Sequence, residues 1–363
     1  MNRPFSIYLD AVRFIAAFLV YVYHSNQRRI VADILPASDY GHSAVIVFFV
    51  LSGFVIAYIT DTKERFWATY TASRISRVYS VAVPALILTV LLDSIGRQLY
   101  PGLYDYPFDQ FVVRLASSLL MLNEVWFVSI TTFSNVPYWS ICYELWYYVA
   151  FGLLTFLPRR VAWWTAGGLL LLLGPKLVML APIWGAGVLL YRWRALRALP
   201  MVWAVALLLL SVLGLLTFFM SDVEKMATVW LKSLVGANWH VQLTFSKFFL
   251  SDYLLAILVF TNFVAMRRVA VLIAPVLIVI ERPVRFLAAY TFTLYLLHQP
   301  LFLFWAAVIR GNPQGYAYWL STTALVMLSV MAVGHFTENR RHQFRKWLEV
   351  YLSGIPTLLK RAA

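Results

Sequence analysis

The sequence predicts an all-α membrane protein, a polytopic bundle of about ten transmembrane helices with both termini in the cytoplasm. Three observations predict it. Hydrophobic residues make up 62% of the 363 residues and charged residues only 13%, whereas a soluble surface needs about a quarter to a third charged residues. Several apolar runs approach the roughly 20 residues that cross a bilayer core. Basic residues concentrate in alternate connecting segments, as the positive-inside rule requires.

The ten helices are predicted in order along the chain, and two regions need comment. The first span carries Asp10 and Arg13 and no small-residue cleavage site follows it, so we interpret it as a retained helix. The fifth and sixth are short, and three alternatives are open for them: they tilt, they pair in a hairpin, or their bounds are drawn wrongly. Segment 111–128 is expected to be a partial helix, because a full span would invert every later one. The predicted spans are 7–24, 42–60, 76–95, 139–157, 161–174, 177–191, 200–219, 251–266, 286–309 and 316–335.

The charge distribution predicts the orientation. With the N-terminus in the cytoplasm, the cytoplasmic segments hold 20 of the 30 Lys and Arg residues, and the outer segments hold nine. The net charge of +14 therefore faces the anionic lipids of the inner leaflet, and we predict no nucleic-acid partner. The single cysteine, Cys142, excludes an intramolecular disulfide and a zinc–cysteine cluster, and we predict no metal site.

Residues 1–363 are predicted to form a single transmembrane domain, since no repeat and no appended soluble region is visible. The longest outer segments, 96–138 and 220–250, are rich in aromatic and polar residues. Two interpretations of them stay open. They could form a lid or an acceptor-binding surface, or they could be interfacial loops with Trp and Tyr at headgroup level.

Ionisable side chains within spans are costly and are therefore candidate site residues. Asp10 and Arg13 can pair on one helix face. Arg13 and His24 are eleven residues apart, about three turns plus 20°, so they share a face roughly 16 Å apart. Arginine binds phosphate or carboxylate groups well. Histidine can act as a general base that takes the proton of a hydroxyl. An extended ligand such as an acyl-coenzyme A would fit between them. Alternatively, Arg13 snorkels toward the cytoplasm and His24 caps the span.

The second and third spans add two candidates. Ser52 and Gly53 form a small step among large aromatic residues, where another backbone or a thin ligand could approach closely. Ordinary helix packing is the alternative. Arg74 and Arg77 are three residues apart at the start of the third span and could grip a phosphate. Plain positive-inside flanking would also explain them.

The fourth and ninth spans carry the remaining candidates. Trp139 and Ser140 lie at the outer interface, and Glu144 lies about one turn deeper. A carboxylate there could orient a histidine, accept a proton, hold a sugar hydroxyl or pair with an arginine. His298 lies mid-span before the kinking Pro300. It is a candidate site residue, although a core histidine bonded to a backbone carbonyl would give the same pattern.

Five segments in this order resemble the acyltransferase-3 family of integral membrane acyltransferases, which includes bacterial O-antigen and Nod-factor O-acetyltransferases. The resemblance covers nearly the whole chain. It departs from the family where Ser80 follows RISRVY in place of Pro, and where Glu338 lacks a following Pro. The segments are LDAVRFIAAFLVYVYHS, FFVLSGFVI, RISR, WSICYELWYY and YTFTLYLLHQP.

The resemblance implies transfer of an acyl group, often acetyl, from cytoplasmic acyl-CoA to a hydroxyl, usually on a carbohydrate. His24 matches the family's essential histidine and Arg13 its arginine partner; Arg74 and Arg77 match its donor-side pair. Catalytic candidates are therefore His24, Glu144 and Arg13. Donor-binding candidates are Arg13, Arg74, Arg77, Ser52 and Gly53. Further candidates are Asp10, Trp139, Ser140, Tyr295 and His298.

We accordingly predict a multi-pass O-acyltransferase of a bacterial inner membrane, with acyl-CoA as co-substrate, no bound cofactor and a carbohydrate acceptor. A homo-oligomer is one possible state. His24, oriented by Glu144 or another carboxylate, would deprotonate the acceptor hydroxyl; an acyl-histidine intermediate is the alternative. A transporter of an acylated or glycan substrate is the alternative function. Transporters often show internal repeats, and we find none. A non-catalytic partner in polysaccharide export would leave Arg13 and His24 unexplained.

Overall fold

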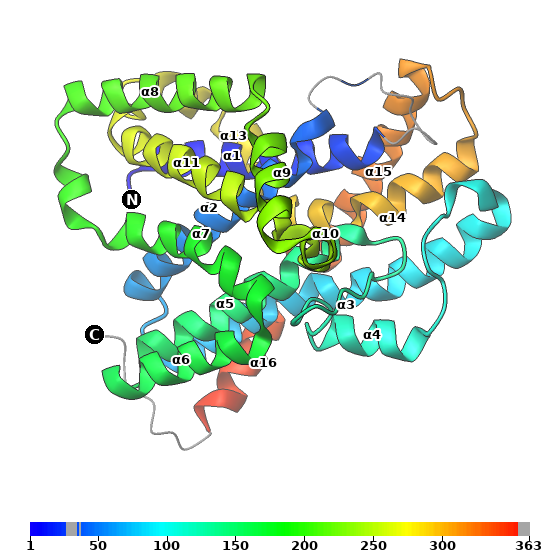
Figure 1. Cartoon of the computed structure of the whole chain (residues 1–363), viewed down its shortest axis with the longest axis horizontal. Coiled ribbons are helices and arrows are strands. Elements are labelled where there is room, and N and C mark those ends of the chain that lie inside the picture. Colours follow the sequence, from blue (N-terminus) through cyan, green and yellow to red (C-terminus); the bar gives the residue numbers. More distant parts are fainter. Residues whose placement is uncertain (27–34, 36–37, 355–363) are drawn as a thin grey trace.

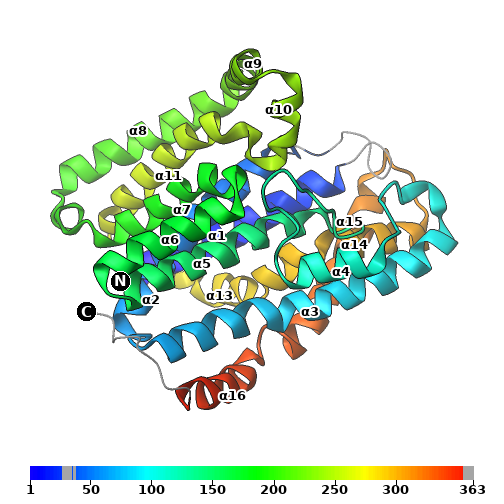
Figure 2. The same ribbon diagram turned by 60° about the horizontal axis from the view of Figure 1, so that its bottom comes forward.

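The computed structural model describes residues 1–26, 35 and 38–354. Within these residues the chain forms helices and turns and no strand. The long helices run side by side as a bundle (Figures 1 and 2). The α-helices are α1 (Arg3–Ser25), α2 (Gly41–Thr62), α3 (Trp67–Leu99), α4 (Phe111–Leu119), α5 (Trp139–Phe156), α6 (Arg159–Leu173), α7 (Pro175–Arg192), α8 (Met201–Met220), α9 (Val223–Val235), α10 (Ala237–Gln242), α11 (Phe249–Val269), α12 (Ala274–Val279), α13 (Glu281–Ala288), α14 (Thr291–Ile309), α15 (Tyr316–Phe336) and α16 (Arg341–Ser353).

Nine of the ten predicted spans each overlap a single helix, and the predicted span 286–309 overlaps two, α13 and α14. Seven helical segments of the described chain are long and apolar enough to cross a membrane, and they contain α1, α2, α3, α8, α11, α14 and α15. The other three, α5, α6 and α7, are the shortest of the ten, at 18, 15 and 18 residues. The all-helical membrane fold is thus confirmed, while the count of ten spans and the side of the termini stay predictions.

The two short helices α6 and α7 form a hairpin, which is one of the three alternatives expected for them. Gly174 joins them with a φ of +98°, and Pro175 then begins α7. A Cβ atom at Gly174 would lie 2.6 Å from the Cα atom of Trp126. The turn therefore needs glycine both for its left-handed backbone and for the close approach of the 120s loop.

The outer segments contain short helices. In 111–128, α4 ends at Leu119 and turns follow, which confirms a partial helix and not a full span. In 220–250, α9 and α10 form most of the segment (Figure 2).

The predicted span 286–309 is wrong at its start, because the chain breaks there. The structure divides it into α13, which ends at Ala288, and α14, which begins at Thr291. Oε2 of Glu338 accepts hydrogen bonds from the backbone N and the Oγ1 of Thr293, both 3.0 Å long. A carboxylate at this point satisfies helix N-terminal amides that would otherwise lack acceptors. The residue that accepts hydrogen bonds at the start of α14 thus lies 45 residues away in the sequence.

Helix α2 lies at the centre of the bundle and packs closely against α7. A Cβ atom at Gly53 would lie 2.0 Å from the carbonyl oxygen of Trp184. A Cβ atom at Gly187 would lie 2.0 Å from the carbonyl oxygen of Val50. Only glycine permits backbones to approach this closely, so these two residues set the distance between the two helices.

Candidate active site

One cavity of about 500 Å³ lies among α1, α2, α3, α5 and α14, with the start of α16 at its edge. Basic side chains outnumber carboxylates in its wall by seven to four, which favours an anionic ligand. The basic residues are Arg13, Lys63, Arg74, Arg77, Arg285, Arg341 and Arg345, and the acidic residues are Asp10, Glu64, Glu144 and Glu338. The wall contains eight predicted site residues: Asp10, Arg13, Ser52, Arg74, Arg77, Ser140, Glu144 and Tyr295.

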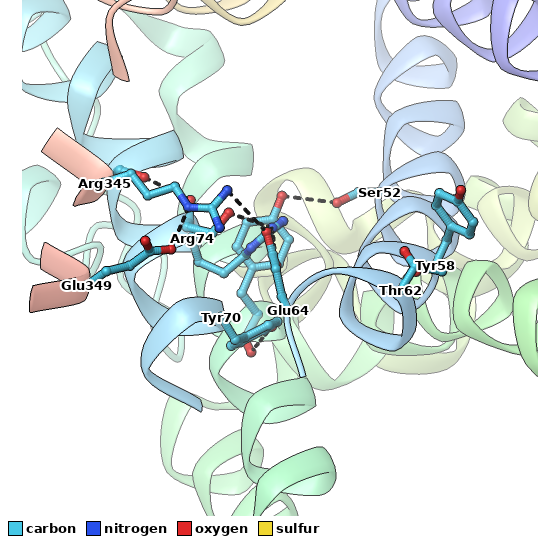
Figure 3. A network of polar contacts seen from close by, with 11 residues as sticks. Ser52, Tyr58, Thr62, Glu64, Tyr70, Arg74, Arg345 and Glu349 are labelled. Atoms are coloured by element: carbon cyan, nitrogen blue, oxygen red, sulfur yellow. Dashed lines mark hydrogen bonds and ion pairs between the residues drawn. The ribbon is translucent and has the colours of Figure 1, made fainter. Parts of the chain in front are cut away.

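Arg74 is neutralised by a carboxylate that we did not predict. Its Nη2 lies 2.8 Å and 2.6 Å from the two carboxylate oxygens of Glu64, and both side chains are buried. The guanidinium also lies 5.5 Å from the ring of Tyr70 and 5.6 Å from that of Tyr148. Figure 3 shows Arg74, Glu64 and Tyr70 beside the end of α2. Arg74 is therefore a buried ion-pair partner as well as a wall residue.

Arg345 extends this network from α16. Its Nη1 lies 4.0 Å from Glu64 and its Nε donates to Glu349 at 2.8 Å (Figure 3). Together with Arg341 it brings the C-terminal helix to the cavity. No sequence motif linked α16 to the third span, because the two are far apart along the chain.

Arg77 differs from Arg74. It is half-buried in the cavity wall, and its guanidinium lies 5.8 Å from the ring of Phe292. Among the ion pairs of residues 1–26 and 38–354, none includes Arg77. Of the predicted donor-side pair, Arg77 is thus the better placed to hold an added anion.

Glu144 forms a compact cluster with α2. Its Oε1 accepts hydrogen bonds from Ser52 Oγ at 2.7 Å and from the hydroxyl of Tyr148. Trp184 Nε1 donates to Ser52 Oγ at 3.3 Å. None of the described hydrogen bonds joins Glu144 to His24, so the expectation that Glu144 orients this histidine is not met by the geometry.

Asp10 and Arg13 pair as predicted. Arg13 Nη1 donates to Asp10 Oδ1 at 3.1 Å, and Arg285 Nη1 donates to Asp10 Oδ2 at 2.9 Å. Arg285 also donates to Glu281, which accepts a second bond from Arg3. Hydrogen bonds from Arg3 and Arg285 lower the pKa of Glu281 to about 2. These connected ion pairs hold α13 against α1 at the edge of the cavity.

Two histidines lie beyond the wall residue Tyr295. Ser140 Oγ and the Tyr295 hydroxyl are hydrogen bonded at 2.6 Å, and the Tyr295 ring lies 6.3 Å from that of His298. The rings of His298 and His24 are 5.2 Å apart. His24 and His298 themselves are not wall residues of the cavity.

His298 has one satisfied and one unsatisfied nitrogen. Its Nδ1 donates to the carbonyl of Leu294 at 3.0 Å, so Nε2 is left as the acceptor. Nε2 of His298 and Nδ1 of His24 are both buried without a hydrogen-bond partner in the part of the chain that the structure describes. Such groups are costly unless something completes them, and a polar group between the rings would do so.

Besides His24 and His298, two further predicted residues, Gly53 and Trp139, are not part of the cavity wall. Gly53 packs against the α7 backbone, so its expected contact with the donor is not supported. Trp139 is buried, with its ring stacked on that of Phe245 at 4.3 Å, and acts in packing at the end of α5. In the described residues no group of three or more His, Cys, Asp or Glu side chains could hold a metal ion.

Several wall residues escaped sequence reasoning. The sequence predicts that Glu64 and Arg285 lie in cytoplasmic loops. No pattern in the sequence indicates that they form ion pairs with Arg74 and Asp10. Tyr148 carried a usable signal, since it lies four residues after Glu144 and therefore on the same helix face.

Comparison with known proteins gives three results. A family model described as an acyltransferase domain matches residues 6–334. The acyltransferase MdmB of Streptomyces mycarofaciens is 30% identical over 176 residues, which cover 44% of this chain and 43% of that protein. The chain thus aligns with less than half of that relative. No solved structure matches significantly.

Proposed function

The chain belongs to the acyltransferase-3 family, and from this premise we propose that it is a membrane O-acyltransferase. It takes an acyl group, most readily acetyl, from acyl-CoA on the cytoplasmic side. It transfers the group to a hydroxyl of a cell-surface glycan or glycolipid precursor. We place it in a bacterial inner membrane, in line with the predicted spans and the distribution of basic residues.

The surplus of basic side chains in the cavity carries this proposal. The cavity combines Arg13, Arg77 and Arg341 with a volume of about 500 Å³, which lies in the range of small-molecule sites. Acyl-CoA carries several phosphates at one end and a thioester at the end of a long arm. Arginine suits phosphate through its planar, bidentate donor set. The phosphates would lie among the arginines and the arm would point toward Ser140 and Tyr295.

The reaction would take place beyond the inner end of the cavity. His24 accepts the proton of the acceptor hydroxyl, and the hydroxyl oxygen attacks the thioester carbonyl carbon. The carbon–sulfur bond then breaks, and the CoA sulfur leaves as a thiolate that takes up a proton. His298 lies 5.2 Å from His24 between ring centres, and its free Nε2 supplies a second acceptor for a hydroxyl. In the alternative path, His24 itself forms the bond to the acyl carbon before the acceptor does.

The experiment that tests the proposal measures CoA release by purified protein supplied with acetyl-CoA and a crude extract of envelope glycans. Three proteins are compared: wild type, His24→Ala and the control His335→Ala. His335 is exposed near the end of α15 and lies outside the cavity. We expect glycan-dependent release by wild type and control, and a loss of at least a hundredfold in His24→Ala.

Full activity of a correctly inserted His24→Ala protein would contradict the assigned base. The two chemical paths differ in another readout. When acetyl-CoA is added without acceptor and the protein is quenched, covalent catalysis leaves one acetyl mass on His24, whereas general base catalysis leaves none. Transport of the glycan across vesicles without any acyl donor would favour the transporter instead.

A further inference from the structure

A second pocket, of about 400 Å³, lies where α2, α7 and α11 meet the start of the chain. It shares no wall residue with the cavity described above. The charged side chains of its wall are Arg197, Arg267 and Arg268, and its wall contains no carboxylate. We call it the arginine pocket.

The arginines of the arginine pocket form no ion pair with the described residues, and the Asp61 carboxylate interacts with Tyr191 of the wall. Arg267 Nη1 donates to the carbonyl of Leu190 at 2.8 Å, and Arg197 Nη2 donates to the carbonyl of Tyr191 at 2.7 Å. Both acceptors are neutral. No ion pair between described residues includes any of the three arginines, whereas the active-site cavity holds four carboxylates. Arg197 and Arg267 lie in the wall of the same pocket, and like charges that share a pocket repel each other, so a bound anion would relieve this repulsion.

The wall of the pocket also has an aromatic side. The guanidinium of Arg197 lies 5.0 Å from the ring of Tyr191, and that of Arg267 lies 5.9 Å from the ring of Phe54. The rings of Tyr58 and Tyr191 are 6.0 Å apart. Figure 3 shows Tyr58 on the side of α2 away from the Arg74–Glu64 pair. The two arginines are thus held in place by aromatic faces and backbone carbonyls, with donor atoms to spare.

We propose that the arginine pocket binds a phosphate group, carried either by the headgroup of an anionic phospholipid or by a small soluble phosphate. Arginine donors match phosphate oxygens in pairs. The pocket lies at the predicted cytoplasmic ends of α2, α7 and α11, where basic clefts between helices meet anionic headgroups. The partly exposed rings of Tyr58 and Tyr191 in the wall provide apolar surface next to the charge, which suits a lipid better than a free anion.

The test measures binding to purified full-length protein in a neutral detergent, with no acyl donor present. Phosphatidylglycerol is titrated in one arm, phosphatidylcholine in a second and inorganic phosphate in a third. The pocket variant is Arg197→Gln with Arg268→Gln, both exposed residues. The charge-matched control is Arg159→Gln with Arg160→Gln, an exposed pair at the start of α6 outside the pocket.

We expect wild type and control to bind phosphatidylglycerol saturably, and the pocket variant to bind it about thirtyfold more weakly, as expected for two lost arginine–phosphate contacts. If inorganic phosphate competes at concentrations similar to those of phosphatidylglycerol, the ligand is a free phosphate. If it does not compete, the ligand is the lipid. Equal binding by all three proteins, or equal binding of phosphatidylcholine, would overturn the proposal. Since the readout is binding, this result is independent of transferase activity.

Discussion

Asn135 donates a hydrogen bond, 2.7 Å long, to the carbonyl oxygen of Leu296. That carbonyl lies four residues before Pro300, which has no N–H with which to complete the helical bond. A side chain from before α5 thus supplies the donor that the proline lacks. His298 lies between Leu296 and Pro300, so this bond fixes the helical turn that presents it.

Removing the Asn135 donor should lower the unfolding free energy. Restoring a backbone N–H at position 300 should make this loss smaller. Asn135→Ala leaves a buried carbonyl unsatisfied, which costs about 1–3 kcal/mol of unfolding free energy. In Pro300→Ala protein the new N–H can bond to Leu296, so the same change at Asn135 should cost little. Thermal unfolding and acyl transfer of the four proteins of the cycle measure the coupling.

Asn262→Ala serves as the control for this cycle, because this asparagine bonds Tyr8 and Ser211 elsewhere in the bundle. Its cost should be the same in wild type and in the Pro300→Ala background. If Asn135→Ala costs as much in the Pro300→Ala background as in wild type, the assigned relationship between Asn135 and Leu296 is wrong.

Substitutions of the two arginines of the RISR segment, Arg74 and Arg77, should affect different properties, stability in one case and donor binding in the other. Arg74→Gln leaves the buried Glu64 without its partner and should lower the unfolding free energy by about 3–5 kcal/mol. Arg77→Gln breaks no ion pair in the described chain and should leave stability nearly unchanged. It should raise the KM for acyl-CoA by roughly ten- to a hundredfold through a lost charged hydrogen bond. Thermal unfolding and donor titrations separate the two effects.

The double variant Glu64→Gln with Arg74→Gln gives the control, since it removes both charges and should recover much of the lost stability. An Arg77→Gln protein that unfolds as easily as Arg74→Gln, with an unchanged KM, would assign Arg77 a structural role instead.

Gly53 should be intolerant of alanine because the α7 backbone occupies the space. Gly53→Ala places a Cβ atom 2.0 Å from the Trp184 carbonyl oxygen, and the forced separation of α2 and α7 should cost at least about 1–3 kcal/mol. Gly185→Ala is the matched control in α7, where a Cβ atom would meet nothing within 4 Å. It should be neutral, or stabilise the helix by roughly 0.5–1 kcal/mol. Similar thermal unfolding of the two variants would refute the close packing.

Glu281 should make the α1–α13 contact dependent on pH. Because its pKa in the folded protein is lowered to about 2, its stabilisation is present above its ordinary pKa of 4.5. It is lost as the pH falls through the folded value. Glu281→Gln should therefore lower Tm slightly at pH 6, and the difference should shrink between pH 4.5 and 2. A difference that grows toward low pH would have the wrong sign for this pair.

The all-helical membrane class and the approximate positions of the long helices follow from composition and apolar periodicity, because the bilayer imposes a length and a hydropathy on each span. The Asp10–Arg13 pair was likewise predictable, since helix geometry alone brings residues three apart onto one face. The ordered motifs were sufficient to indicate the family, and the family model over residues 6–334 confirms it.

The partners of these residues were decided only by the tertiary structure. Glu64 neutralises Arg74, and Glu338 caps α14 from 45 residues away. Neither pair has a fixed spacing that a sequence could reveal, because the separation depends on how helices far apart in the chain pack. Gly53 is a second case in which the sequence was not sufficient. The sequence was compatible with the approach of either a ligand or another backbone, and in the structure the α7 backbone occupies that space. The sequence by itself thus determined which ionisable residues lie within the helices, and the packing of distant helices determined which of those charges are paired.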